Sequence, residues 1–108
     1  MTKRATFAVF SVFDVSTRKD IERLMKPAIK GRCRIVADAD DFFGGEGGKD
    51  YCSKVLTNPT YADLLKVLDE QIKATRDDHH VFMEGVVKRR RAKKYADSVP
   101  EYEFLLGS

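Results

Sequence analysis

The most constraining feature of this chain is an apolar stripe with helical spacing between residues 61 and 72. Its members recur at intervals of three and four residues: Tyr61, Leu64, Leu65, Leu68 and Ile72, with Val67 beside them. The preceding Asn58-Pro59-Thr60 predicts the helix start, with Asn58 as the N-cap and Pro59 at the first helical position. A helix that is apolar on one face only has to bury that face against another element.

A second stripe predicts another amphipathic helix over residues 17–29. Its apolar positions are Ile21, Leu24, Met25, Ala28 and Ile29. Thr17 or Ser16 can cap this helix. Pro27 is expected to kink it or to end it near Lys26, because proline lacks the amide proton that a helix interior needs. The two stripes together favour a sheet with two helices on one of its faces.

Segments rich in β-branched and aromatic residues surround the two helices. They cover residues 6–13, 33–37, 51–56, 80–87 and 101–106, and residues 51–56 are the weakest of them. The first segment is apolar on both faces, so we expect it near the centre of the sheet. In the last segment, Tyr102 and Phe104 alternate with Glu101 and Glu103, which predicts a half-exposed final strand.

The element order predicts an α+β fold in a single domain over residues 1–108. If residues 51–56 form a strand, the order is βαββαβ, as in a ferredoxin-like sandwich, with an extra C-terminal strand. We expect two helices on one face of a mixed or antiparallel sheet of four to five strands, with the other face left for a partner. Without that strand, a smaller mixed α/β sheet remains.

Composition narrows the class of protein. The chain has 108 residues, enough for one core, and its 43% hydrophobic content argues against global disorder. It has no stretch of about 18 apolar residues, so no membrane span is expected. Two cysteines, Cys33 and Cys52, are too few for a disulfide framework and lack metal-ligand spacing. We therefore expect reduced thiols in a cytoplasmic protein, and a disulfide only if their segments pair.

A run of cations at residues 88–94 is the strongest pointer to a partner. Six of these seven residues are basic, and we name them the basic strip: Lys88, Arg89, Arg90, Arg91, Lys93 and Lys94. The formal net charge is +3, with 20 Lys and Arg against 17 Asp and Glu, so without these six the chain would be mildly acidic. Such a segment attracts phosphates, and Tyr95, which follows it, can stack on a base. The alternative is a solvated loop or a strand end whose charges prevent edge-to-edge pairing.

A segment rich in Asp and Gly at residues 38–50 predicts a flexible loop. Four glycines within residues 44–48 disfavour any regular element. Phe42 and Phe43 just before them are either contact anchors for a protein partner or residues that close the sheet edge. A further expectation is that the acidic segment folds against the basic strip, within one chain or between subunits, because opposite charges of this density attract.

The sequence supports an enzymatic function less strongly than a binding function. Asp38, Asp40 and Asp41 follow a strand end, where carboxylates commonly bind Mg²⁺ or Ca²⁺. With His79 or His80 they would suit a metal-assisted hydrolase or a phosphoryl-transfer enzyme, yet neighbouring strand residues point to opposite faces. The glycines do not match a phosphate-binding loop or a dinucleotide fingerprint. We therefore expect no catalytic set, no metal site and no cofactor.

The sequence favours a small binding module for an anionic partner, either nucleic acid or an acidic protein surface. Its expected contacts are the six residues of the basic strip together with Tyr95. The first alternative is a protein-interaction or self-assembling module, a homodimer for instance, that uses a sheet face or edge. The residues expected to contact a protein partner are Phe42, Phe43, Tyr102 and Phe104.

Overall fold

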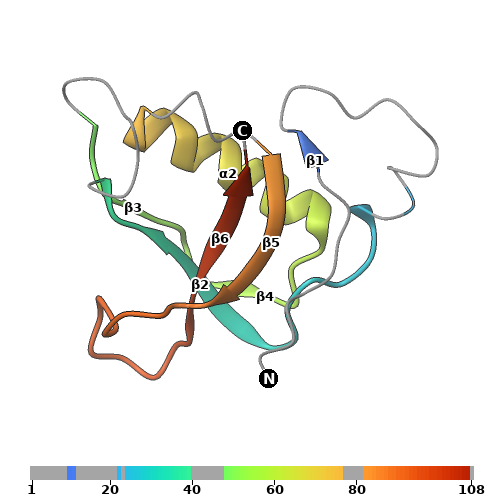
Figure 1. Ribbon diagram of the computed structural model, residues 1–108. Helices are drawn as coiled ribbons and strands as arrows, with labels where there is room; N and C mark the ends of the chain where they lie inside the picture. Colours follow the sequence, from blue (N-terminus) through green and yellow to red (C-terminus); the bar gives the residue numbers. More distant parts are fainter. Residues whose placement is uncertain (1–9, 12–21, 23, 40–47, 77–81, 108) are drawn as a thin grey trace.

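The computed structural model describes residues 10–11, 22, 24–39, 48–76 and 82–107. The elements, in chain order, are β1 (Phe10–Ser11), β2 (Arg32–Ala37), β3 (Tyr51–Cys52), β4 (Leu56–Thr57), α2 (Tyr61–Thr75), β5 (Phe82–Lys88) and β6 (Glu101–Gly107). They form a small mixed α/β fold in which α2 packs against one face of a mixed sheet (Figure 1).

The sheet has the strand order β1-β5-β6-β2-β3, with β4 pairing with β2 as well. β6 runs parallel to β2, with Ile35 opposite Tyr102, and the other pairs are antiparallel. The C-terminal strand, expected as a half-exposed addition, therefore lies inside the sheet between β5 and β2. The ferredoxin-like order is not confirmed, because the last strand, and not the first, lies at the centre of this sheet.

The weak strand expected at residues 51–56 is present in two short pieces, β3 and β4, which pair with opposite ends of β2. Between them, Ser53 keeps the ladder intact. Its N–H donates to the Ile35 carbonyl at 2.8 Å, and its hydroxyl accepts the Ile35 N–H at 2.9 Å. The hydroxyl thus replaces a backbone acceptor, which leaves no polar group of Ile35 unpaired in a buried stretch.

The helix predicted from the stripe is α2, but its N-cap is Thr60 rather than Asn58. Thr60 and Asp63 form a capping box, in which the Thr60 hydroxyl accepts from the Asp63 N–H at 3.2 Å and the Asp63 carboxylate accepts from the Thr60 N–H at 2.9 Å. Asn58 instead has φ 48° and accepts the Gly31 N–H at 2.6 Å. Gly31 itself has φ 90°, a turn conformation that favours glycine.

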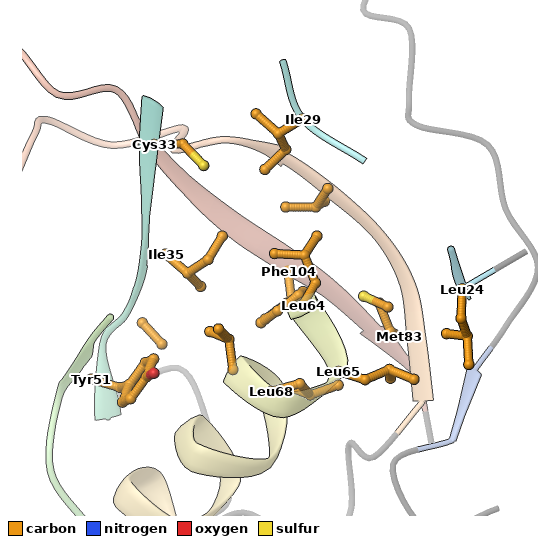
Figure 2. Packing of buried hydrophobic residues seen from close by; sticks show 13 residues of the cluster. Leu24, Ile29, Cys33, Ile35, Tyr51, Leu64, Leu65, Leu68, Met83 and Phe104 are labelled. Carbon is orange, nitrogen blue, oxygen red and sulfur yellow. The ribbon is translucent and has the colours of Figure 1, made fainter. Parts of the chain in front are cut away.

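The core lies between α2 and the facing side of the sheet (Figure 2). Leu64 and Leu68 from the helix stripe are fully buried against Ile35 of β2 and Phe104 of β6. Tyr102 and Leu106 pack on the same cluster, so the alternation predicted for the last strand is correct. Helix α2 covers the apolar face of this strand, however. That face is apolar because β6 lies in the interior of the sheet.

Of the first predicted helix, residues 17–29, the structure describes residues 22 and 24–29, and a second helix is not confirmed. Pro27 lies in an isolated bridge to Thr60, and the Ala28 N–H donates to the Pro59 carbonyl at 2.9 Å, so the chain is extended there. This agrees with the break expected near Lys26. Of the first predicted strand, the structure describes residues 10–11, which pair with β5. They stand at one end of the strand order, whereas the sequence predicted a position near the centre of the sheet.

Both cysteines are free. Cys33 is buried on the helix side of β2, where burial raises the pKa of its thiol, and Cys52 is half-buried at the end of β3. Of the helical segments within the described ranges, none combines the length and the apolar character needed to cross a bilayer.

Candidate polyanion interface

The basic strip begins at the end of β5 and continues into the irregular segment between β5 and β6. We name residues 89–100 the basic loop (orange in Figure 1). A buried carboxylate holds this loop in place. Glu101, whose side chain has no exposed surface, accepts the Lys94 N–H at 2.7 Å and the Tyr95 N–H at 2.9 Å. The loop is therefore a fixed structure whose backbone is tied to the first residue of β6.

Arg89 is part of the same internal framework. Its side chain is 8% exposed; its Nη2 donates to Asp38 at 3.0 Å, its Nε to the Ala92 carbonyl at 2.9 Å, and the Nε lies 4.0 Å from a Glu101 oxygen. The buried Nη1 has no hydrogen-bond partner among the described residues. A guanidinium enclosed by two carboxylates and a carbonyl stabilises the loop and presents little charge to a partner.

Asp38 connects three members of the basic strip. Its carboxylate lies 2.6 Å from Lys94 Nζ and 2.7 Å from Arg91 Nη1, in addition to Arg89. Partial burial tends to raise the Asp38 pKa, but the hydrogen bonds and charges of Lys94 and Arg89 outweigh it and hold the pKa at about 2. Asp50 adds a second carboxylate at 3.0 Å from Lys94 Nζ. The described ends of the acidic segment thus contact the basic strip within one chain.

Other cations of the strip point outward. The side chains of Arg90 and Arg91 are 68% and 55% exposed, and Lys88 is exposed as well. Arg90 Nε pairs with Glu103 at 2.5 Å. We name Lys88, Arg90 and Arg91 the outer set, and Arg89, Lys93 and Lys94 the inner set.

Lys93 belongs to the inner set because its ammonium group holds the loop backbone. Its Nζ donates to the carbonyls of Asp97 and Val99 at 2.6 and 2.7 Å. Asp97 also pairs with Arg34 Nη1 at 2.9 Å, and hydrogen bonding to Arg34 lowers the Asp97 pKa. Through Asp97 the loop is connected to β2 as well as to β6.

Tyr95 is an exposed aromatic residue on this loop. The Arg34 guanidinium lies 4.8 Å from its ring centroid, within the range of a cation–π contact. A hydrogen bond with the Cys52 side chain raises the pKa of the Tyr95 hydroxyl. The ring is thus held by side chains from β2 and β3, while 44% of the residue stays exposed.

The remaining predicted site residues do not join this surface. Phe104 is buried in the core and Tyr102 packs against it, so neither forms the exposed protein-contact face that the alternation suggested. Their apolar side is the one covered by α2. Phe42 and Phe43 lie outside the described residues, as do Asp40, Asp41, His79 and His80. Among the residues that are described, no group of three or more His, Cys, Asp or Glu side chains is placed to hold a metal ion.

The sequence reasoning missed Arg34, Asp97 and Glu101. One sequence signal was present for Glu101: it opens the last strand on the face opposite Tyr102 and follows a basic run, which makes it a candidate acceptor for that run. Arg34 carries no such signal, since it lies 61 residues before Tyr95 and meets it only because β2 lies beside β6.

Comparison of the chain with family models, with curated protein sequences and with solved structures finds no match.

Proposed function

We propose that this protein is a small binding module that contacts an anionic partner, most simply nucleic acid, through the outer set of the basic strip. The observation that carries the proposal is the division of the strip into two sets. Arg89 and Lys94 are enclosed by carboxylates, whereas Arg90 and Arg91 are more than half exposed. Arg90 and Arg91 also pair with Glu103 and Asp38, but pairs made by such exposed arginines add little to stability, so their charge is available to a partner.

The charge balance of the loop supports the same proposal. Among the described residues, seven cations meet five carboxylates in this region. The cations are Arg34 and the six members of the basic strip, and the carboxylates are Asp38, Asp50, Asp97, Glu101 and Glu103. The excess charge lies on exposed side chains, where it can replace the counterions of a phosphate backbone.

Two finer expectations from the sequence belong to this proposal. One is a second helix within residues 17–29 that ends before Pro27 and lies on the same sheet face as α2; it is supported by Leu24, which is buried in the same core cluster as the α2 stripe. The other is a cytoplasmic setting, which the two free cysteines support, because free thiols persist in reducing compartments.

The test is a fluorescence-anisotropy titration of the full chain with mixed-sequence DNA and RNA at two salt concentrations. The test variant is Lys88→Ala/Arg90→Ala/Arg91→Ala. A matched control, Lys54→Ala/Lys66→Ala/Lys73→Ala, removes three exposed lysines from β3–β4 and α2, outside the loop. Both variants lower the net charge equally. A difference in affinity between them is therefore caused by where the lost charges lie and not by their number.

We expect the outer-set variant to bind at least tenfold more weakly. Its log–log salt slope should be smaller by roughly 2 to 3, one unit for each lost phosphate contact. The control should bind nearly as the unaltered protein does, and thermal melts should show that both variants are folded. Equal loss in both variants, or full affinity in the outer-set variant, would overturn the proposal. Binding of a polyanionic peptide in place of nucleic acid would identify an acidic protein surface as the partner.

A further inference from the structure

Tyr95 stands out among the exposed apolar side chains. The exposed large hydrophobic residues in the described part of the chain are Met25, Val55 and Tyr95, and Tyr95 is the one that lies on the basic loop. Its neighbours in sequence include Lys93 and Lys94, and Arg34 covers one face of its ring. An exposed aromatic ring surrounded by cations is the combination found where unpaired bases bind.

The position of the ring is fixed before any partner arrives. The Tyr95 N–H is bound by the buried Glu101 carboxylate at 2.9 Å, so the backbone at this residue is anchored to β6. Arg34 holds the ring from β2 and is itself only 14% exposed, because Asp97 pairs with it. A ring that is already ordered loses little conformational entropy when a base stacks on it.

We propose that Tyr95 and Arg34 form a stacking site for an unpaired base, so that the anionic partner is single-stranded nucleic acid. This inference rests on the proposed function and deepens it. A base stacks on the ring face that Arg34 leaves open, and the outer set contacts the flanking phosphates. Stacking tolerates every base, so the site binds single strands with little sequence preference.

The geometry favours a single strand over a duplex. Readout of a duplex groove needs a helix or a two-stranded ribbon that fits into the groove. Residues 89–100 form an irregular loop, and the described helix, α2, lies against the sheet, away from the basic strip. The bases of a duplex already stack on one another and cannot reach the Tyr95 ring without being unpaired. A duplex would therefore use only the charges of the loop.

The test compares one sequence in two forms, as a single strand carrying 2-aminopurine and as the matching duplex, with the full-length protein. The unaltered protein should bind the single strand at least tenfold more tightly and should quench the 2-aminopurine fluorescence by stacking. Tyr95→Leu keeps an apolar side chain but removes the ring. It should weaken single-strand binding roughly tenfold, within the range for loss of one base–aromatic stack, and leave the salt slope unchanged.

Tyr95→Phe is the matched control, because it keeps the ring and removes only the hydroxyl that contacts Cys52. It should bind like the unaltered protein. Thermal melts check that Tyr95→Leu is folded, and the quenching of the unaltered protein tests the site without any substitution. Equal affinity of the unaltered protein for both forms, absence of quenching, or full affinity in a folded Tyr95→Leu variant would overturn the stacking site.

Failure of the stacking site and failure of the proposed function are distinguishable. If the outer-set variant loses salt-dependent binding while Tyr95→Leu does not, the polyanion surface stands and the stacking site is wrong. If the unaltered protein binds neither form at low salt, both are wrong.

Discussion

The charged residues of α2 and those of the basic loop look alike in the sequence but differ in what they do. Lys73 pairs with Asp69 at 2.9 Å across one turn of α2, and their side chains are 75% and 41% exposed. Arg89 pairs with Asp38 at 3.0 Å across 51 residues of sequence, and their side chains are 8% and 16% exposed. The two pairs have nearly the same length.

The difference shows that burial, rather than the distance between the charged groups, decides how much an ion pair contributes to the stability of the fold. Water and salt screen an exposed pair, which is typically worth about 0 to 1 kcal/mol. Breaking a buried pair leaves an uncompensated charge, which costs several kcal/mol. The helix is held by its caps and its apolar stripe, whereas the basic loop depends on the carboxylates of Asp38, just after β2, and of Glu101 in β6. The following predictions test this contrast, from the largest expected effect to the smallest.

Replacing Glu101 by Ala should destabilise the protein most, by about 3 to 5 kcal/mol. The substitution removes the acceptor of the Lys94 and Tyr95 N–H groups and a neighbour of the buried Arg89. Urea denaturation followed by circular dichroism measures the change. Glu103→Ala is the control, because Glu103 pairs with the exposed Arg90 and should cost less than about 1 kcal/mol. Equal effects of the two would show that the loop does not depend on the buried carboxylate.

Asp38→Asn should cost about 2 kcal/mol at neutral pH, since it removes the charge that three basic side chains share. The folded-state pKa of Asp38 is about 2, below its ordinary value of 3.8. A depressed pKa gives stability that is complete above about pH 4 and is lost as the pH falls towards 2.

The stability difference between the unaltered protein and Asp38→Asn should therefore shrink between about pH 4 and pH 2. Asp50, whose pKa is also lowered, titrates in both proteins. Denaturant titrations across this window make the measurement. A difference that stays constant with pH would contradict the pairing of Asp38 with the strip.

Thr60→Ala should cost about 1 kcal/mol, because it removes the N-cap hydroxyl of α2. Thr60→Ser keeps the hydroxyl and should cost less. Asn58→Ala serves as the comparison for the cap position that the sequence suggested; it should disturb the turn at Gly31 but leave the helix cap intact. Amide hydrogen exchange in the first turn of α2 separates the two effects, since Thr60→Ala alone should speed exchange there.

Lys73→Ala should change stability least, by about 0.5 kcal/mol or less, because the pair with Asp69 is exposed. The effect should disappear at 1 M salt, where charges are screened within about 3 Å. Thermal melts at low and high salt measure it. If Lys73→Ala lowered the free energy of unfolding as much as Glu101→Ala does, the contrast between the helix and the loop would be wrong.

Part of the candidate site could be predicted from sequence. The basic strip is visible as a run of charge, and its placement after β5 follows from the apolar segment before it. Which of its members are exposed could not be predicted, since that depends on Asp38, just after β2, and on Glu101 of β6. The burial of Phe104 and Tyr102 against the core could not be predicted for a related reason: alternation shows that two sides differ, but not which side the helix covers.

By itself, the sequence determined the elements whose signals are local. The stripe from Tyr61 to Ile72 specifies α2 because side chains three and four residues apart share a helix face. The tertiary structure alone decided that the last strand lies beside β2 and that Arg89 is internal while Arg90 is exposed. Such outcomes depend on contacts between residues distant in the chain, and no local pattern of residues encodes their energies.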